Sequence, residues 1–295
     1  MNISLITGQS AMRIAALVTC YNRVAQTIQC LTGLFEAIAN QNLASFEVFL
    51  VDDASPDRTG EIVKQRFPQV HVLTGTGSLF WNRGMCYAYA GARASGAFDA
   101  YMLFNDDVAF KPDALREMLP TYLQLNRTAP SVLSGPVCER ATGQTTYGGM
   151  RSFGRYRPLA FELVPADGTI RECDTFNANF VLIPAEPMDA VGGLDPAYHH
   201  AYGDIDLGLM LRKRGCKTYI FPEHVGYCEY DRGELVVPPF RKRLMAIFKS
   251  KSPISDRIHF TYKRYSWPLA TVLATAQIAR RFLKVFGTSQ DSWEH

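Results

Sequence analysis

The chain has 295 residues, enough to bury one large core, and its 47% hydrophobic and 20% charged residues are ordinary for a globular protein. Its seven cysteines are scattered, with no CxxC pair, which argues against a disulfide framework or a zinc ribbon and favours a reducing compartment. The formal net charge of +3 is unevenly spread along the chain.

Strand and helix signals alternate in the first half of the chain. Short apolar runs predict strands at 14–19, 46–51, 70–74 and 101–104. Helices are expected after Asn22, near 57–66, from about Asn82 and from Pro112, and Ser55 is expected to cap the second of them. Strands separated by helices predict an α/β fold with a parallel sheet, in which ligands bind at the carboxyl ends of the strands.

The pattern is looser from about residue 131, where Gly and aromatic residues are frequent. It becomes regular again at "TFNANFVLIP" (175–184), which we predict as one strand. The stretch "GDIDLGLMLRKRG" (203–215) predicts a helix that Gly215 can end.

The C-terminal part of the chain is basic. Residues 241–286 contain eleven Lys or Arg and one Asp, a charge of +10, whereas residues 1–240 sum to −5. We therefore expect one domain over residues 12–240 and a basic helical extension over 241–295. The apolar and basic side chains of 264–286 suit an anionic membrane surface, although packing on the domain or on a second copy of the chain in a homo-oligomer are alternatives.

No membrane span or secretory signal is expected. The first 20 residues lack a basic segment followed by a long apolar stretch. The best span, Trp267 to Ala279, is shorter than the roughly 20 residues that a spanning helix needs, and it contains Thr and Gln.

Acidic residues follow two of the predicted strands. Asp52 and Asp53 end the second strand, where they can accept hydrogen bonds from a base or a ribose, or simply form a turn. Asn105, Asp106 and Asp107 follow the fourth strand without a basic neighbour. Adjacent carboxylates repel unless a cation lies between them. Mg²⁺ or Mn²⁺ shared with a diphosphate would be such a cation, and a solvated turn is the alternative.

A second acidic pair opens the predicted helix at 203–215. The helix dipole favours the ionised forms of Asp204 and Asp206. An ionised carboxylate that faces a bound hydroxyl can act as a general base. Plain N-terminal acidity is the alternative, but it does not explain why His199, His200 and Tyr202 crowd the same entrance.

Five stretches in order, "VTCYNR", "VDDASPDRTGEI", "GSLFWNRGM", "LFNDDV" and "FNANFVLIPAEPMDAVGGLDPAYHHAYGDIDLGLMLRKRG", resemble the family 2 glycosyltransferases over about residues 12–230. These are inverting enzymes of the GT-A fold, a Rossmann-like and mainly parallel sheet flanked by helices. The resemblance is closest to bacterial members that build lipopolysaccharide, capsule and other surface glycans. It implies an enzyme that moves a sugar from a nucleotide-sugar to a glycan or lipid-linked acceptor. With the basic extension, we expect a cytoplasmic enzyme that is peripheral on the inner face of the plasma membrane.

The resemblance also implies roles for single residues. Asp52 and Asp53 match the acids that contact the nucleobase and ribose, and Asp204 matches the catalytic base in a "GDxD" variant of "EDxD". "NDD" matches the DxD motif, which makes Asp107 the metal ligand and directs Asp106 toward the sugar or ribose.

Further residues are assigned by their position in these motifs or, for the other metal ligand, in the later stretch "FPEHVGYCEY" (221–230). His224 is our choice as the other metal ligand, with Cys228 as the alternative. The remaining expected substrate-binding residues are Trp81, Arg83, Asn179 and Asp206. Arg83 in particular would help to neutralise the diphosphate of the donor.

Two other functions compete with glycosyl transfer. A sugar-nucleotide nucleotidyltransferase would show a Gly-rich loop with a Lys or Arg after its first strand, and "VTCYNRVAQ" has none, while "LTGTGS" lacks a Walker lysine. A non-enzymatic protein that binds anionic polymers would use the basic extension. No recognisable DNA- or RNA-binding motif accompanies that charge, so no nucleic-acid partner is expected.

Overall fold

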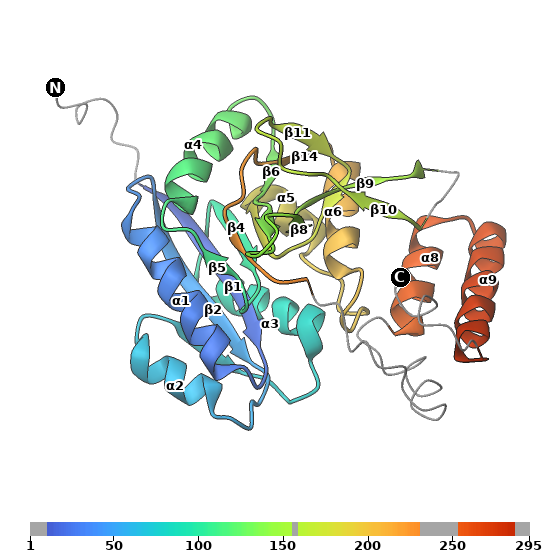
Figure 1. Cartoon of the computed structure of the whole chain (residues 1–295), viewed down its shortest axis with the longest axis horizontal. Coiled ribbons are helices and arrows are strands. Elements are labelled where there is room, and N and C mark those ends of the chain that lie inside the picture. The colour runs from blue at the N-terminus through green and yellow to red at the C-terminus, as the bar shows by residue number, and fades with distance from the viewer. Residues whose placement is uncertain (1–10, 155–158, 231–252, 287–295) are drawn as a thin grey trace.

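The computed structural model describes residues 11–154, 159–230 and 253–286 (Figure 1). The first half contains β1 (Met12–Cys20), α1 (Val24–Ala39), β2 (Ala44–Asp52), α2 (Thr59–Arg66), β3 (His71–Thr74), α3 (Phe80–Ser95), β4 (Ala100–Phe104), β5 (Ala109–Phe110), α4 (Ala114–Asn126), β6 (Ser131–Ser134), β7 (Val137–Cys138) and β8 (Thr145–Tyr147). The second half contains β9 (Gly149–Ser152), β10 (Phe161–Leu163), β11 (Arg171–Cys173), β12 (Thr175–Phe176), β13 (Phe180–Pro184), α5 (Ala185–Val191), α6 (Gly203–Lys213), β14 (Lys217–Ile220), β15 (Gly226–Tyr227), α8 (Ile254–Arg264) and α9 (Trp267–Phe286).

The main sheet has eight strands in the order β11-β14-β6-β13-β4-β1-β2-β3. Strands β4, β1, β2 and β3 are parallel to one another, as are β6 and β14. Strand β13 runs antiparallel to both of its neighbours, β4 and β6. The prediction of an α/β fold with a mainly parallel sheet is confirmed.

Helices cover both faces of this sheet (Figure 1). In β1, Ile14 and Val18 pack into the cluster that contains α1 and α4, whereas Ala15 and Leu17 pack into the cluster with α3 and α6. A strand that is buried on both faces needs apolar residues at every position, which is why its sequence is a continuous apolar run.

The stretch 175–184 is two strands, so the prediction of one strand is wrong. β12 pairs with β9 in a small sheet, while β13 pairs with β4 and β6 in the main sheet. The chain changes sheets at Asn177–Asn179, and this link lies at the edge where β4 ends, since the Asn105 N–H donates to the Asn179 carbonyl over 3.2 Å.

The turn after β2 caps a neighbouring helix, so the prediction that Ser55 caps its own helix is also wrong. Ser55 Oγ accepts the Asn22 N–H over 2.9 Å, and Asp57 Oδ2 accepts the N–H of Val24, the first residue of α1, over 2.9 Å. Because β1 and β2 are adjacent parallel strands, their ends bring this turn against the start of α1.

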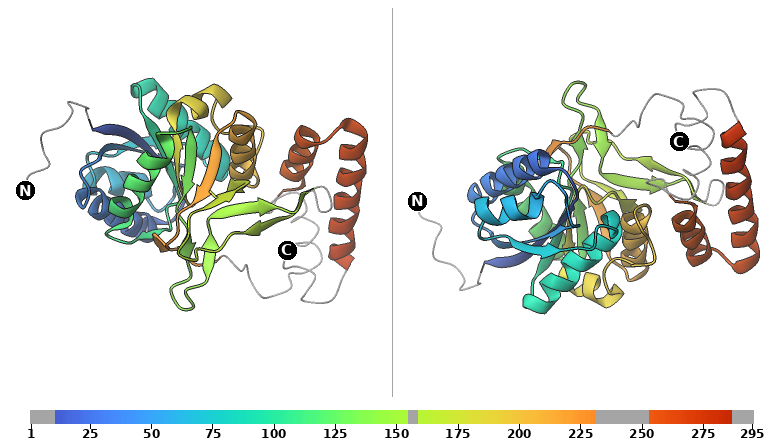
Figure 2. Two further views of the ribbon diagram at one scale, coloured as in Figure 1. Left: turned by 90° about the horizontal axis from the view of Figure 1, so that it is seen from above. Right: turned by 90° about the horizontal axis from the view of Figure 1, so that it is seen from below.

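Helices α8 and α9 lie at the end of the molecule where β9 and β10 project (Figure 2). The Phe260 ring of α8 contacts Phe161 of β10 and Tyr202, with centroids 6.2 and 5.0 Å apart. The predicted domain boundary at 240/241 lies outside the described residues, so the division remains a prediction. Within the described ranges, no helix combines the length and hydropathy that crossing a membrane requires.

Candidate active site

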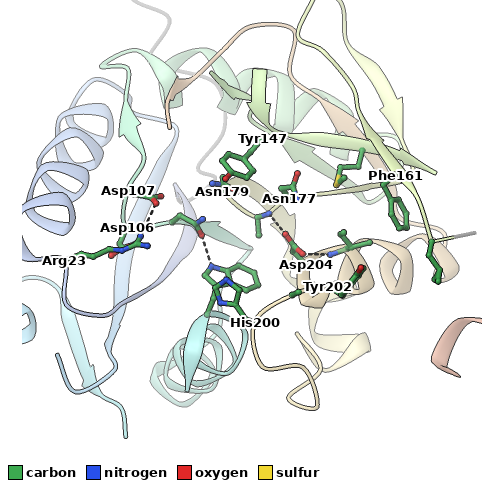
Figure 3. A pocket seen from close by; sticks show the side chains of 17 residues that line it. Arg23, Asp106, Asp107, Tyr147, Phe161, Asn177, Asn179, His200, Tyr202 and Asp204 are labelled. Atoms are coloured by element: carbon green, nitrogen blue, oxygen red, sulfur yellow. Dashed lines mark hydrogen bonds and ion pairs between the residues drawn. The ribbon is translucent and has the colours of Figure 1, made fainter. Parts of the chain in front are cut away.

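A cleft of about 560 Å³ opens at the edge of the main sheet where β4 ends and β13 begins (Figure 3). Its wall includes side chains from the turns after β1 and β4, the β12–β13 link and the start of α6. Of the predicted site residues, the cleft brings together Trp81, Asp106, Asp107, Asn179 and Asp204. Asp52, Asp53, Arg83, Asp206 and His224 are not among the residues that line it.

The cation between the adjacent carboxylates is a side chain of the protein. Arg23 Nη1 lies 3.3 Å from Asp106 Oδ1 and 3.1 Å from Asp107 Oδ2, and Thr27 donates to Asp106 Oδ2 over 3.2 Å. Burial raises the pKa of Asp106 to about 6, although Arg23 opposes that rise. Arg23 lines the cleft and is a candidate site residue that was not predicted from the sequence. Its signal was a basic residue just past the first strand, at the same sheet edge as the acids.

Asp107 is the more exposed acid of this pair, and its role as a metal ligand remains a prediction. Its side chain is 35% exposed in the cleft, and its other oxygen, Oδ1, lies 3.5 Å from the Cys228 thiol. Burial and the nearby Asp107 raise the pKa of Cys228 well above its ordinary value, so the thiol stays protonated. The described residues contain no cluster of three or more His, Cys, Asp or Glu suited to a metal. Mg²⁺ is usually held by one or two carboxylates together with substrate phosphates and water, and Asp107 would supply such a carboxylate to an ion that enters with the donor.

Cys228 and His224, the two alternatives for the other metal ligand, have different neighbours. Cys228 contacts Asp107, and the Asn179 amide nitrogen lies 3.7 Å from the same sulfur. His224 instead contacts Thr145, with Nε2 2.8 Å from Oγ1. Burial and Lys111 lower the pKa of His224. The structure therefore does not bring His224 together with Asp107.

Asp204 stands at the start of α6 and faces the same cleft, apart from the Asp106–Asp107 pair (Figure 3). Its Oδ1 accepts the Ile205 N–H over 2.8 Å, and its Oδ2 accepts the Ala178 N–H over 3.2 Å. Burial raises the pKa of this carboxyl, and these hydrogen bonds oppose the rise. A carboxylate that is held but poorly solvated suits proton abstraction.

The glycine before Asp204 has a steric explanation. A Cβ at Gly203 would lie 1.8 Å from Asn82 Oδ1. Asn82 is itself buried and held in place, because its amide nitrogen donates to the carbonyls of Asp195 and Tyr198 over 2.8 and 3.0 Å. Because α3 packs this closely against the start of α6, a glutamate, as in the "EDxD" pattern, does not fit at position 203.

Asp52 and Asp53 organise turns in this structure. Asp52 accepts the backbone N–H groups of Ser55 and Gly60 over 3.1 and 3.2 Å. The Asp53 carboxylate accepts four backbone N–H groups at 2.7–3.2 Å, from Thr76, Gly77, Leu79 and Phe80. These contacts match the turn-forming alternative, and a role in nucleotide binding remains a prediction.

Arg83 and Asp206 make structural contacts as well. Arg83 Nε donates to the Pro196 carbonyl over 3.1 Å. Asp206 is fully buried, and its carboxylate pairs with Lys263 Nζ at 2.6 Å and with Arg264, both from α8. In contrast, Trp81 lines the cleft and its indole N–H donates to Asn105 Oδ1 over 2.8 Å.

Helix α8 also holds the loop that leads into α6. The fully buried Asp256 carboxylate accepts the N–H groups of His199, His200 and Ala201 at 3.0–3.1 Å and lies 3.0 Å from His199 Nδ1. This contact accounts for the His199 side chain, while the Tyr202 ring packs near Phe260 of the same helix, with centroids 5.0 Å apart. The partner of this segment, Asp256, lies 55–57 residues away along the chain and therefore could not be predicted from the local pattern.

The fold and the cleft define an α/β enzyme with acidic groups gathered at the carboxyl edge of its sheet. Residues 15–168, just over half of the chain, match the family model described as glycosyl transferase family 2. The chain belongs to this family, and its reaction class is glycosyl transfer, as the sequence analysis predicted. No curated protein matches the chain.

Solved structures also match the chain at low identity, and the first of them shares its fold. One is the mannosyltransferase PcManGT from Pyrobaculum calidifontis in complex with GDP-Man and Mn²⁺, with 17% identity, a TM-score of 0.53, and coverage of 97% of this chain and 84% of that chain. Another is S. aureus TarS 1-349 in complex with UDP-GlcNAc, with 14% identity, a TM-score of 0.49, and coverage of 80% of this chain and 66% of that chain.

Proposed function

We propose that this protein transfers a sugar, with inversion, from a nucleoside-diphosphate sugar to a hydroxyl of a glycan or lipid-linked acceptor in bacterial surface polysaccharide synthesis. The observation that carries the proposal is that, in this family 2 glycosyltransferase, Asp204 and the Arg23–Asp106–Asp107 cluster line the same cleft. PcManGT, which shares the fold, was solved with GDP-Man and Mn²⁺, and this supports a nucleotide-sugar donor and a divalent ion.

The proposed reaction is a single displacement. Asp204 removes the proton from the acceptor hydroxyl, whose oxygen attacks the anomeric carbon, while the nucleoside diphosphate leaves from the opposite face. Arg23 keeps positive charge beside Asp106 and Asp107, at the end of the cleft where the diphosphate would lie. Mg²⁺ or Mn²⁺ bound at Asp107 would supply Lewis-acid neutralisation of the leaving group.

Nucleotide binding is the first test of this function. Thermal unfolding would be followed with a panel of nucleotide-sugars and nucleoside diphosphates, each with Mn²⁺, with Mg²⁺ and with chelator. A ligand that binds the native state at a hundred times its Kd adds about 2.7 kcal/mol to the free energy of unfolding. We expect one nucleotide series to stabilise the protein only when metal is present.

The other outcomes of this test have distinct meanings. Stabilisation that persists in chelator would be consistent with the proposed transferase function but would contradict its metal dependence. The absence of a shift with every nucleotide, with or without metal, would contradict the proposed function.

We also propose that α9 binds the anionic inner leaflet of the plasma membrane and makes the enzyme a peripheral cytoplasmic protein. Trp267, Val272 and Leu283 on this helix are 65–74% exposed, and the surrounding segment 241–286 carries a charge of +10. Apolar side chains together with positive charge favour the interface of an anionic bilayer.

Vesicle flotation tests this location. The protein should float with vesicles that contain anionic phosphatidylglycerol and stay unbound with pure phosphatidylcholine, and the triple substitution Trp267→Ser, Val272→Ser, Leu283→Ser should abolish flotation. Equal flotation of this variant would contradict the proposal. A wild-type dimer that the same substitutions convert to a monomer, without any vesicle binding, would assign this surface to a homo-oligomer.

A further inference from the structure

A second cavity, of about 530 Å³, adjoins the cleft. The two share four wall residues, namely Tyr147, Met150, Phe161 and Asn177. Asn177 also hydrogen-bonds the Asp204 carboxylate through its side chain, which opposes the rise in the pKa of that group. The second cavity therefore begins beside Asp204.

The opposite end of the cleft is not shared with the second cavity. Arg23, Asp106 and Asp107 line the cleft but not the second cavity. If the diphosphate of the donor lies at those residues, the second cavity extends from the acceptor side of Asp204. An acceptor whose hydroxyl faces Asp204 would thus continue into it.

The wall of this cavity combines aromatic rings with uncharged polar groups. The rings of Tyr147 and Tyr230 are nearly parallel, with centroids 5.9 Å apart and an interplanar angle of 26°, and Phe161 lies in the same wall. Gln144 and Asn177 add amide groups, and the hydroxyls of Thr145 and Thr146 complete the set. Apolar and aromatic surface with a few placed polar groups is typical of small-molecule sites of this size.

The charge of the wall restricts the ligand. Among the described residues that line the cavity, none is Lys or Arg, and Glu139 is the one carboxylate. The neighbouring Arg140 places its guanidinium over the Tyr227 ring, 4.0 Å from the centroid, and is not part of this wall. Phosphate and carboxylate ligands need such cations for charge-assisted hydrogen bonds, so the wall suits an uncharged ligand.

The polar groups of the wall are partly preorganised. Thr145 Oγ1 lies 2.8 Å from His224 Nε2, and Thr146 Oγ1 donates to the carbonyls of Cys228 and Val137 over 2.8 and 3.2 Å. The exposed Gln144 and the 55% exposed Tyr230 lie where a ligand can reach them. His224, predicted as a metal ligand, thus supports this second cavity.

We infer that the second cavity is an acceptor subsite that binds an uncharged sugar of a glycan. The apolar C–H face of a sugar ring packs on an aromatic ring, and its hydroxyls match amide and carboxylate groups such as those of Gln144 and Glu139. This inference rests on the proposed function and narrows its acceptor. The enzyme then extends a glycan end in which a neutral sugar lies next to the sugar that bears the attacking hydroxyl, and this cavity does not bind a lipid diphosphate.

Binding to a glycan array tests the inference directly. The probes are neutral oligosaccharides, oligosaccharides that carry phosphate or uronic acid, and undecaprenyl diphosphate in detergent, applied to the full chain with Mn²⁺ and UDP or GDP. We expect the wild type to select neutral oligosaccharides. Tyr230→Ala and Gln144→Ala should each weaken that binding, Tyr230→Ala by about tenfold. Tyr87→Ala, which removes a comparably exposed tyrosine on α3, should leave it unchanged.

Thermal shifts with the nucleotides on the same samples separate this inference from the proposed function. Three results would overturn the subsite alone, provided that the nucleotide shift is retained. The wild type binds no neutral glycan, or it prefers the anionic probes, or both cavity variants bind neutral glycans as well as the wild type does. Loss of the nucleotide shift in Tyr230→Ala would assign the cavity to the donor and also overturn it. A wild type that shows no nucleotide shift would contradict the proposed function itself.

Discussion

Asp204→Asn is expected to slow sugar transfer by about 10²–10⁴-fold while donor binding is retained, because removal of a general base has an effect of this size. The amide cannot take the proton from the acceptor hydroxyl, whereas the donor contacts expected at the other end of the cleft are untouched. Turnover with saturating donor and acceptor measures the first effect, and the thermal shift with nucleotide measures the second.

The structure indicates that the fold tolerates this substitution. The Asn oxygen can still accept the Ile205 N–H, which lies 2.8 Å from Oδ1, and the lost bond to the Ala178 N–H would cost about 1 kcal/mol. Asp113→Asn, at a partly exposed position before α4 and outside the cleft, is the matched control and should turn over normally. Near-normal turnover of Asp204→Asn would exclude Asp204 as the base.

The pH dependence gives a second readout for the same residue. The base acts in its ionised form, and burial raises the pKa of Asp204 above its ordinary 3.8. The transfer rate should therefore fall as the pH drops through a pKa above 3.8, and rise to a plateau on the alkaline side. The residual rate of Asp204→Asn should lack the part of the acidic limb that comes from Asp204, whereas a limb that comes from Asp106, with its pKa of about 6, should persist.

Asp206→Ala is expected to lower the free energy of unfolding by about 3 kcal/mol. Asp206 is fully buried between Lys263 and Arg264, and its removal leaves two cations beside α6 without their shared carboxylate. We take the lower end of the range for broken buried pairs because the Lys263 side chain is 28% exposed and also pairs with Asp195 at 2.6 Å. Urea unfolding at neutral pH measures the change.

A surface pair provides the control for this stability effect. Glu61→Gln breaks the exposed pair with Arg58, and it should change the free energy of unfolding by no more than about 0.5 kcal/mol. Asp206→Ala could instead keep the wild-type free energy of unfolding and lose donor binding. That result would support the prediction that Asp206 binds substrate and would contradict its proposed role in stability.

The sequence by itself determined the fold class and the edge of the sheet at which the chemistry lies. Continuous apolar runs such as the one in β1 mark strands that are buried on both faces, and the helices between them require parallel pairing. The acids after β2 and β4 had to lie at the same edge, since the carboxyl ends of parallel strands coincide, although only those after β4 line the cleft. Burial requirements of this kind are local and can be read from neighbouring residues.

Only the tertiary structure decided which partner each charged group has. Arg23 meets Asp106 across 83 positions because β1 pairs with β4, and Lys263 meets Asp206 across 57 because α8 packs on α6. The same holds for Cys228, which contacts Asp107, and for His224, which contacts Thr145. A charge is neutralised by whatever group the packing brings within about 4 Å, and that distance is set by strand and helix contacts between remote segments.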